Sequence, residues 1–318
     1  MKRPSLNPLR ATATAVLAVV LTTLLFLAGT SPASATGKSH HKHQNHPAQS
    51  IAVKGQVTTP ASYTAADLAA LPQTTLPDDR SRTARGDLTG VLLESLVTAA
   101  APATPPIKNA DLRVSVVVAG EHRAVAATLG ELQPRFGNHP ALLVTRGHGR
   151  HAQTDLVFPG DLGHQRTVHA VRSITVSVAD PELPAGLPAG SIRIRTDRGS
   201  VLVTARRLAK LPQITRTVTF TSGSGQQTRV ETGPTLAAVL RAAHVRTSSS
   251  SVVAAIADDN YVSTVTPGEA TSGRRTLLLS LVEDGVVLTQ PRLVTDGDIA
   301  GGRYVSGLLG LQVTNTCR

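Results

Sequence analysis

The sequence predicts an α+β fold built from two tandem copies of one unit, each with a mixed sheet and short helices. Three observations lead to this prediction: an internal duplication, β-branched runs interspersed with short capped helices, and a Pro/Gly-rich segment between the copies. Because several of the expected strands are joined only by short turns, a mixed sheet is favoured over a purely parallel one.

The duplication is clearest around two Leu-Pro-Gln segments. Thr64–Thr75 and Thr204–Thr215 are identical at eight of twelve positions, at a constant offset of 140. Further pairs follow in the same order: Gly130-Glu131 with Gly268-Glu269, and Gly160-Asp161 with Gly297-Asp298. The period is too long for a solenoid, so we expect each copy to have its own core.

Composition sets the expected boundaries. They are a signal peptide (1–35), a disordered His-rich tail (36–50), a first copy (51–178), a Pro/Gly linker (179–190) and a second copy (191–318). We call the two copies the first repeat and the second repeat.

Strand cores and helix starts recur at matching places in the two repeats. Apolar, largely β-branched runs predict strands at Val114–Val118, Leu142–Val144, Ile174–Val178, Val252–Ile256, Leu277–Leu279 and Leu309–Val313. Capping boxes predict helices after Thr64 (with Asp67), Thr128 (with Glu131) and Thr266 (with Glu269). Thr89 and Thr232 are expected to cap longer helices over Val91–Ala100 and Thr235–Ala243, with Pro234 in a first helical turn.

The amino-terminal residues indicate Sec-type export to an extracellular or cell-wall location. Lys2, Arg3 and Arg10 precede an apolar run from Ala11 to Gly29, and Ala33-Ser34-Ala35, a signal-peptidase pattern, follows it. A retained membrane anchor is the alternative, and no other segment is apolar enough to span a membrane. No Arg-Arg pair precedes the apolar run, so a cofactor inserted before export is not expected.

The net charge and the cysteine content limit the kinds of partner and of covalent cross-link that are expected. Removing residues 1–35 removes 3 of 32 Lys and Arg and none of 21 Asp and Glu, which leaves a net charge of 29 − 21 = +8. This charge favours an anionic cell-wall polymer or surface protein as partner. The chain has no Trp, so nucleic acid is not expected. Cys317 is the single Cys, which excludes an intrachain disulfide and leaves cross-linking of two chains open.

Two groups of histidines are candidate metal ligands. Imidazole nitrogens bind zinc, copper and nickel, and the tail places four of them together: His40, His41, His43 and His46. In the first repeat, His148, His151 and His164 lie on expected loops and would leave a fourth position open on a zinc ion. Solvated linker or loop histidines are the alternative in both cases.

Each repeat resembles the molybdopterin-binding domain of sulfite-oxidase-type oxidoreductases. The segments that carry the resemblance are Asp67-Leu68, Gly90-Val91 and Val157-Phe-Pro-Gly160 in the first repeat, and Asp259-Asn-Tyr261, Pro291-Arg-Leu-Val294 and Arg303-Tyr-Val305 in the second. The resemblance implies the fold of that domain and, in an active member, a molybdenum cofactor. Such a pattern of core and turn positions is more specific for fold than for function.

The departures from the family pattern concern the cofactor. The metal-binding Cys of the family should fall in Asp78–Leu88 or Thr217–Glu231, and neither segment contains Cys. A hydroxyl is a far poorer ligand than a thiolate. At the position where the family often has a Lys for the pterin phosphate, this sequence has His169 and Ser306. No cofactor is therefore expected.

These observations predict a non-catalytic binding or scaffold module at the cell surface. The alternative is a genuine oxidoreductase with an unusual molybdopterin or metal site. If a small anion or sugar binds in a vacated pocket, the polar residues of the second repeat nearest to it would be Asp259, Asn260, Tyr261, Asp298 and Arg303. Turn chemistry alone also explains clustered Asp, Asn and Gly. The oligomeric state and the ligand are not evident from the sequence.

Overall fold

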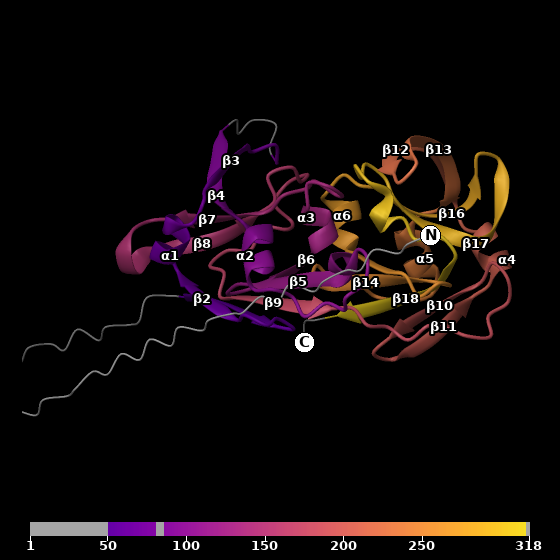
Figure 1. Ribbon diagram of the computed structural model, residues 1–318, viewed down its shortest axis with the longest axis horizontal. Helices are drawn as coiled ribbons and strands as arrows, with labels where there is room; N and C mark the ends of the chain where they lie inside the picture. Colours follow the sequence, from indigo (N-terminus) through magenta and orange to yellow (C-terminus); the bar gives the residue numbers. More distant parts are fainter. Residues whose placement is uncertain (1–49, 81–85, 316–318) are drawn as a thin grey trace, which may run out of the picture. The chain divides into compact units, whose positions relative to one another are not determined.

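The computed structural model describes residues 50–80 and 86–315 (Figure 1). The expected signal peptide, most of the His-rich tail and Cys317 lie outside the described residues. The first repeat contains β1 (Ser50–Gly55), β2 (Ala61–Thr64), α1 (Ala65–Ala70), β3 (Thr74–Pro77), β4 (Asp87–Leu92), α2 (Leu93–Ala99), β5 (Val114–Ala119), β6 (Ala124–Thr128), α3 (Leu129–Leu132), β7 (Leu142–Arg146), β8 (Gln153–Val157) and β9 (Ser173–Val178), with 3-10 turns at Ala110–Arg113 and Gly149–His151.

The second repeat has its elements in a similar order. They are β10 (Ile192–Thr196), β11 (Gly199–Val203), α4 (Ala205–Ala209), β12 (Gln213–Ser222), β13 (Gly225–Pro234), α5 (Leu236–Ala242), β14 (Ser251–Ala257), β15 (Val262–Val265), α6 (Pro267–Thr271), β16 (Leu277–Glu283), β17 (Val286–Thr295) and β18 (Leu308–Asn315), with a 3-10 turn at Gly301–Arg303.

The described strands form four sheets, in two matching pairs. The five-stranded sheets have the orders β2-β1-β9-β5-β6 and β11-β10-β18-β14-β15, and the four-stranded sheets β3-β4-β7-β8 and β12-β13-β16-β17 (Figure 1). In each five-stranded sheet one pair is parallel, β1 with β9 or β10 with β18, and the other pairs are antiparallel. The chain is therefore mixed α and β with few, short helices, and its sheet pairs are consistent with tandem units.

Each repeat has its own hydrophobic cluster, as the alternation of apolar residues along its strands requires. In β5, Val114, Val116 and Val118 are fully buried and belong to the cluster of the first repeat. In β14, Val253 and Ala255 belong to the cluster of the second. Because successive side chains of a strand point to opposite faces, Val117 lies on the other face, where it packs against Val252 of the second repeat.

Helix capping follows the sequence with one difference. Thr64 with Asp67 and Thr266 with Glu269 both form complete capping boxes, which confirms those predictions. At α3, the Thr128 hydroxyl accepts from the Glu131 amide, but the reciprocal bond is missing. The Glu131 carboxylate instead accepts a hydrogen bond from Arg166 at 2.5 Å, so a charged partner replaces the backbone amide of the box.

The prediction that Thr89 and Thr232 cap helices was wrong. Both lie inside strands, β4 and β13, and their hydroxyls form cross-strand hydrogen bonds with Thr75 at 2.8 Å and Thr215 at 2.9 Å. The helices begin later, at Leu93 and Leu236, and Thr235 caps the second of them. Threonine suits both a strand and an N-cap, so the pairing partner decides its role.

Contacts between the repeats come in related pairs. The Leu162 amide donates to the Ser272 carbonyl at 2.7 Å, and the Ile299 amide donates to the Phe136 carbonyl at 2.8 Å. A Cβ at Gly130 would lie 2.7 Å from the Cδ of Arg303, and a Cβ at Gly268 would lie 2.8 Å from the Cδ of Arg166. The arginine of each repeat thus packs against a glycine of the other.

None of the described helices is both long and apolar enough to cross a membrane.

Candidate functional site

The place where the resemblance implies a metal-binding Cys is a β-hairpin in the second repeat. Strands β12 and β13 pair along their whole length, and Val218 and Phe220 of β12 pack with Leu278, Val294 and Tyr304. The Phe220 and Tyr304 rings meet edge to face with centroids 4.4 Å apart. Of the equivalent segment in the first repeat, Asp78–Leu88, residues 81–85 lie outside the described residues.

The positions implied for a pterin phosphate contact already have polar partners. In the first repeat, His169 Nδ1 lies 3.0 Å from Asp155 Oδ2, a carboxylate that would repel a phosphate. In the second, Ser306 accepts a hydrogen bond from Arg292 Nε at 2.9 Å.

The Arg292 guanidinium is itself neutralised. It donates to Glu231 Oε1 at 3.1 Å and also contacts Glu283. Glu231 is fully buried, and its other carboxylate oxygen has no hydrogen-bond partner within the described chain. Among the described residues these positions offer neither a thiolate nor an uncompensated cation, so they do not fit a molybdopterin.

Two of the five predicted pocket residues, Asp298 and Arg303, lie together in a sealed cluster. Arg303 is fully buried and donates to Asp298 Oδ2 at 2.8 Å, to Asp298 Oδ1 at 2.6 Å and to Glu269 Oε2 at 2.6 Å. Arg275 donates to the same Asp298 at 2.8 Å. Burial raises the pKa of Glu269 above its ordinary value, although the neighbouring Arg303 opposes this shift. The guanidinium of Arg303 is thus held by the carboxylates of both Asp298 and Glu269.

The first repeat has the same cluster with one exchange. Arg166 donates to Asp161 and to Glu131, as Arg303 does to Asp298 and Glu269. His139 takes the place of Arg275, and its Nε2 lies 2.8 Å from Asp161 Oδ1. Burial alone would raise the pKa of Asp161, but the hydrogen bonds from Arg166 and His139 hold it below its ordinary value. Both clusters therefore stabilise the interior and offer no open cation.

The other three predicted pocket residues form the turn between β14 and β15. Asp259 accepts from the Tyr261 amide at 2.9 Å, and Asn260 has the left-handed φ of 66° typical of such a turn. The Tyr261 hydroxyl donates to the Gly302 carbonyl at 2.5 Å, and the Asn260 carbonyl accepts from Arg113 of the first repeat at 3.1 Å. Burial raises the pKa of Tyr261. The turn thus makes a contact between the repeats.

The predicted histidine ligands lie on surface loops. His148, His151 and His164 are exposed, and no three His, Cys, Asp or Glu side chains within residues 50–80 and 86–315 are arranged to hold a metal ion. A zinc site there remains a prediction. His40, His41, His43 and His46 fall outside the described residues.

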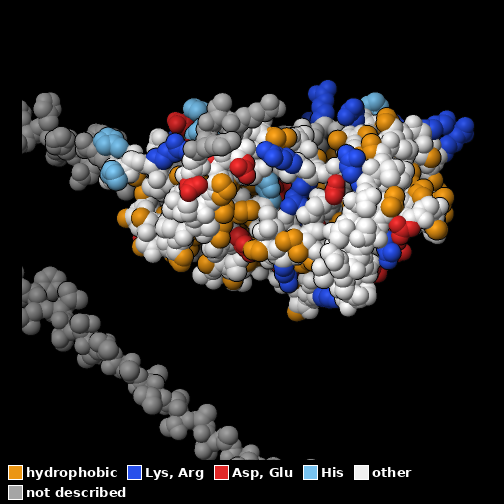
Figure 2. Space-filling model, turned by 90° about the horizontal axis from the view of Figure 1, so that it is seen from above, with side chains coloured by type: hydrophobic (Ala, Val, Ile, Leu, Met, Phe, Trp, Pro, Cys, Tyr) orange, Lys and Arg blue, Asp and Glu red, His pale blue; other side chains and the backbone are white. Residues whose placement is uncertain are grey.

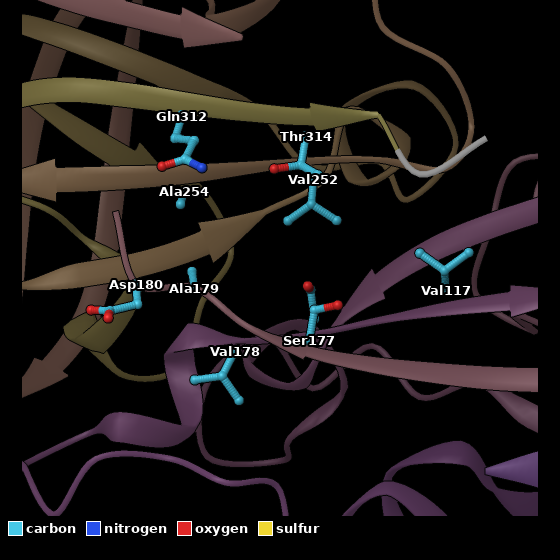
Figure 3. A pocket seen from close by; sticks show the side chains of 10 residues that line it. Val117, Ser177, Val178, Ala179, Asp180, Val252, Ala254, Gln312 and Thr314 are labelled. Carbon is cyan, nitrogen blue, oxygen red and sulfur yellow. The ribbon is translucent and has the colours of Figure 1, made fainter. Parts of the chain in front are cut away.

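A small cavity of about 140 Å³ lies where the two five-stranded sheets meet (Figure 3). Its walls come from equivalent strands, with Val117 and Ser177 on one side and Val252 and Thr314 on the other. Asp180 at its edge lies 3.5 Å from Arg113 and is otherwise exposed. Because both repeats contribute its walls, the cavity belongs to the junction of the repeats.

A group of unpaired cations forms the most distinctive polar surface. From Gly199 to Ala257 the sequence has seven Lys or Arg and one acidic residue, Glu231, which is fully buried. Arg216 and Arg229 have carboxylate partners. The rest have no ion pair with any described carboxylate, and we call them the basic face: Arg206, Arg207, Lys210, Arg241 and Arg246.

The basic face is carried by two neighbouring helices. Arg206, Arg207 and Lys210 lie on α4 and at its end, and Arg241 lies on α5. The Arg207 guanidinium contacts the Ala242 carbonyl, which joins the two helices. Figure 2 shows Lys and Arg side chains projecting from the right-hand end of the molecule, where acidic side chains are also visible. Sequence inspection by residue type missed this face, although the long stretch with a single acidic residue was a usable signal.

Comparisons with known proteins add little. No family model matches the sequence, and no curated protein matches it. Among solved structures the chain is similar to the sulfane dehydrogenase SoxCD from Paracoccus pantotrophus, at 12% identity over 81% of this chain and 77% of that chain. The TM-score is 0.29, so this likeness supports no statement about activity.

Proposed function

We propose that this protein is a secreted, non-catalytic relative of the molybdopterin-binding domains that docks on an anionic polymer at the cell surface. The basic face is the observation that carries the proposal. Five exposed cations on α4, on α5 and in the segments that follow these helices have no ion pair with a described carboxylate, so their charge is available to phosphate or carboxylate groups.

The charged groups elsewhere support a non-catalytic role. Arg166 and Arg303 are sealed in pairs with their own carboxylates, and Arg292 is held by Glu231. A substrate anion would find no free cation at these positions. The sequence also lacks the thiolate on which the redox chemistry of the resembled family depends.

The test is binding to a soluble poly(glycerol phosphate), with neutral dextran as the control polymer. Replacing Arg206 and Lys210 together by Glu should weaken binding at least tenfold at low salt, because like charges now face the polymer. The same two-residue exchange at Lys54 and Arg146, both exposed in the first repeat, should weaken it less than about twofold.

Salt provides a second measurement on the same proteins. Binding through exposed cations should fall steeply as the Debye length shortens from about 10 Å at 0.1 M to about 3 Å at 1 M. Equal loss in the two double variants would contradict docking through the basic face. If neutral dextran bound as tightly as poly(glycerol phosphate), charge would have no role in the binding.

A further inference from the structure

A groove in the second repeat lies between α5 and α6 and has a volume of about 280 Å³. Its walls are apolar: Leu236 and Leu240 come from α5, Val245 follows that helix, Ala270 comes from α6, and Leu277 begins β16. Leu236, Leu240 and Leu277 belong to the core of the repeat, so the groove opens directly onto buried apolar side chains.

The rim of the groove carries one charge. Arg241 is the only charged residue that lines it, and Arg241 is exposed and has no ion pair with a described carboxylate. The acidic residue of α6, Glu269, is fully buried and bonded to Arg303 and to the Thr266 amide. Within the described residues, no carboxylate therefore pairs with the guanidinium at the mouth of the groove.

The first repeat has different residues at the two positions that correspond to Ala237 and Arg241 of the groove. Its helix α2 has Glu94 where α5 has the exposed Ala237, and Thr98 where α5 has Arg241. Glu94 is half-buried, and burial raises the pKa of its carboxyl group despite the nearby Arg135. In the first repeat an acid thus lies where the second repeat has an open apolar position beside a cation.

We infer that the groove of the second repeat binds a fatty-acid-like amphiphile, with its alkyl chain between α5 and α6 and its carboxylate on Arg241. Apolar walls favour the chain because its surface leaves water, and a guanidinium matches a carboxylate with two parallel hydrogen bonds. The volume lies just below the range of about 300–1,000 Å³ found for small-molecule pockets, so it suits one short chain. This ligand goes beyond the proposed polymer docking and does not depend on it.

The first experiment is calorimetry of the purified full chain with hexanoate, octanoate and decanoate. Affinity should rise about fourfold for each added CH₂, the value expected for full burial of a methylene. Decyltrimethylammonium, a cation of the same chain length, should bind at least about tenfold more weakly than decanoate. No saturable heat with decanoate would overturn the inference, as would equal binding of the cation.

Variants taken from the first repeat provide the structural test. Ala237→Glu introduces the residue found at Glu94 and should reduce decanoate affinity at least tenfold, whereas Glu94→Ala should leave it unchanged. Arg241→Gln should weaken decanoate binding, while affinity should still rise with the length of the alkyl chain. Far-UV circular dichroism controls for folding.

Measuring polymer binding by the same variants tests the proposed function separately from the inferred amphiphile site. Ala237→Glu should lower affinity for poly(glycerol phosphate) less than the exchange of Arg206 and Lys210 does, because its new carboxylate lies one helical turn from Arg241 and can neutralise that cation of the basic face alone. Unchanged decanoate binding in folded Ala237→Glu protein would contradict the groove as the site, whatever the polymer does.

Discussion

The two repeats share a buried framework and differ on their surfaces. Each repeat contains a buried arginine that is bonded to one Asp and one Glu in the same way. The residues are Arg166, Asp161 and Glu131 in the first repeat, and Arg303, Asp298 and Glu269 in the second. Outside these clusters the repeats diverge, as Glu94 against Ala237 and Thr98 against Arg241 show. The comparison teaches that the repeats share their buried ion pairs but differ in the charge of their surfaces.

The largest expected effect comes from removing either buried arginine. Arg303→Met leaves Glu269 and Asp298 buried without their main partner and should lower the free energy of unfolding by about 3–5 kcal/mol. Arg166→Met should cost a similar amount, because its cluster has the same bonds. Urea denaturation measures both, with the exposed Arg172→Met as a control that should cost less than about 0.5 kcal/mol. A small cost for one arginine alone would break the equivalence of the clusters.

Substitution of the glycines that face these arginines should change the stability of the two repeats to different extents. A Cβ at Gly130 meets both the Cδ of Arg303 and a methyl group of Leu112 at 2.7 Å, whereas a Cβ at Gly268 has only the Arg166 Cδ closer than 3.6 Å. Gly130→Ala should therefore cost about 1–3 kcal/mol.

Gly268→Ala should cost less than Gly130→Ala, because its Cβ closely meets only Arg166 and alanine favours the helix by about 1 kcal/mol. Thermal unfolding of the two variants compares them directly. Equal destabilisation would mean that the second contact is as rigid as the first.

The framework was more predictable from the sequence than the site. Runs such as Val114–Val118 indicate strands because β-branched residues alternate between two faces, and the duplication supplies a second example of each element. Thr89 was misassigned because only its partner Thr75, across a hairpin, distinguishes a strand from a cap. Whether Arg303 is open or sealed depends on Glu269, which lies 34 residues away in the chain.

The pH dependence should have opposite signs in the two clusters. The lowered pKa of Asp161 means that its contribution to stability is complete above its ordinary value of 3.8 and is lost as the pH falls through the folded-state value. Asp161→Asn should therefore cost more at pH 7 than at pH 3.

The contribution of Glu269 to stability should depend on pH in the opposite direction. Because its pKa is raised, its contribution is complete below 4.5 and is lost as the pH rises through the folded-state value. Glu269→Gln should accordingly cost less at pH 7 than at pH 4. Urea titrations at these pH values measure both variants, and costs that change in the same direction would contradict the assignment.

The smallest effect should come from the matched threonine pairs. Thr75→Val removes the hydroxyl bonded to Thr89, and Thr215→Val removes the one bonded to Thr232. Each exposed pair should contribute about 0.2–1 kcal/mol, with equal values in the two hairpins. Chemical denaturation of both variants tests this, and a clear difference would show that the hairpins are not equivalent.

The proposed function requires that the chain holds no molybdenum centre, and metal analysis of the native protein tests this requirement most directly. The chain would be purified from its own host and its bound metals measured by mass spectrometry. We predict no molybdenum or tungsten above trace amounts, because the segments Asp78–Leu88 and Thr217–Glu231 supply no thiolate and Arg292 is neutralised by Glu231. A stoichiometric amount of either metal would contradict the account and assign the protein a redox role.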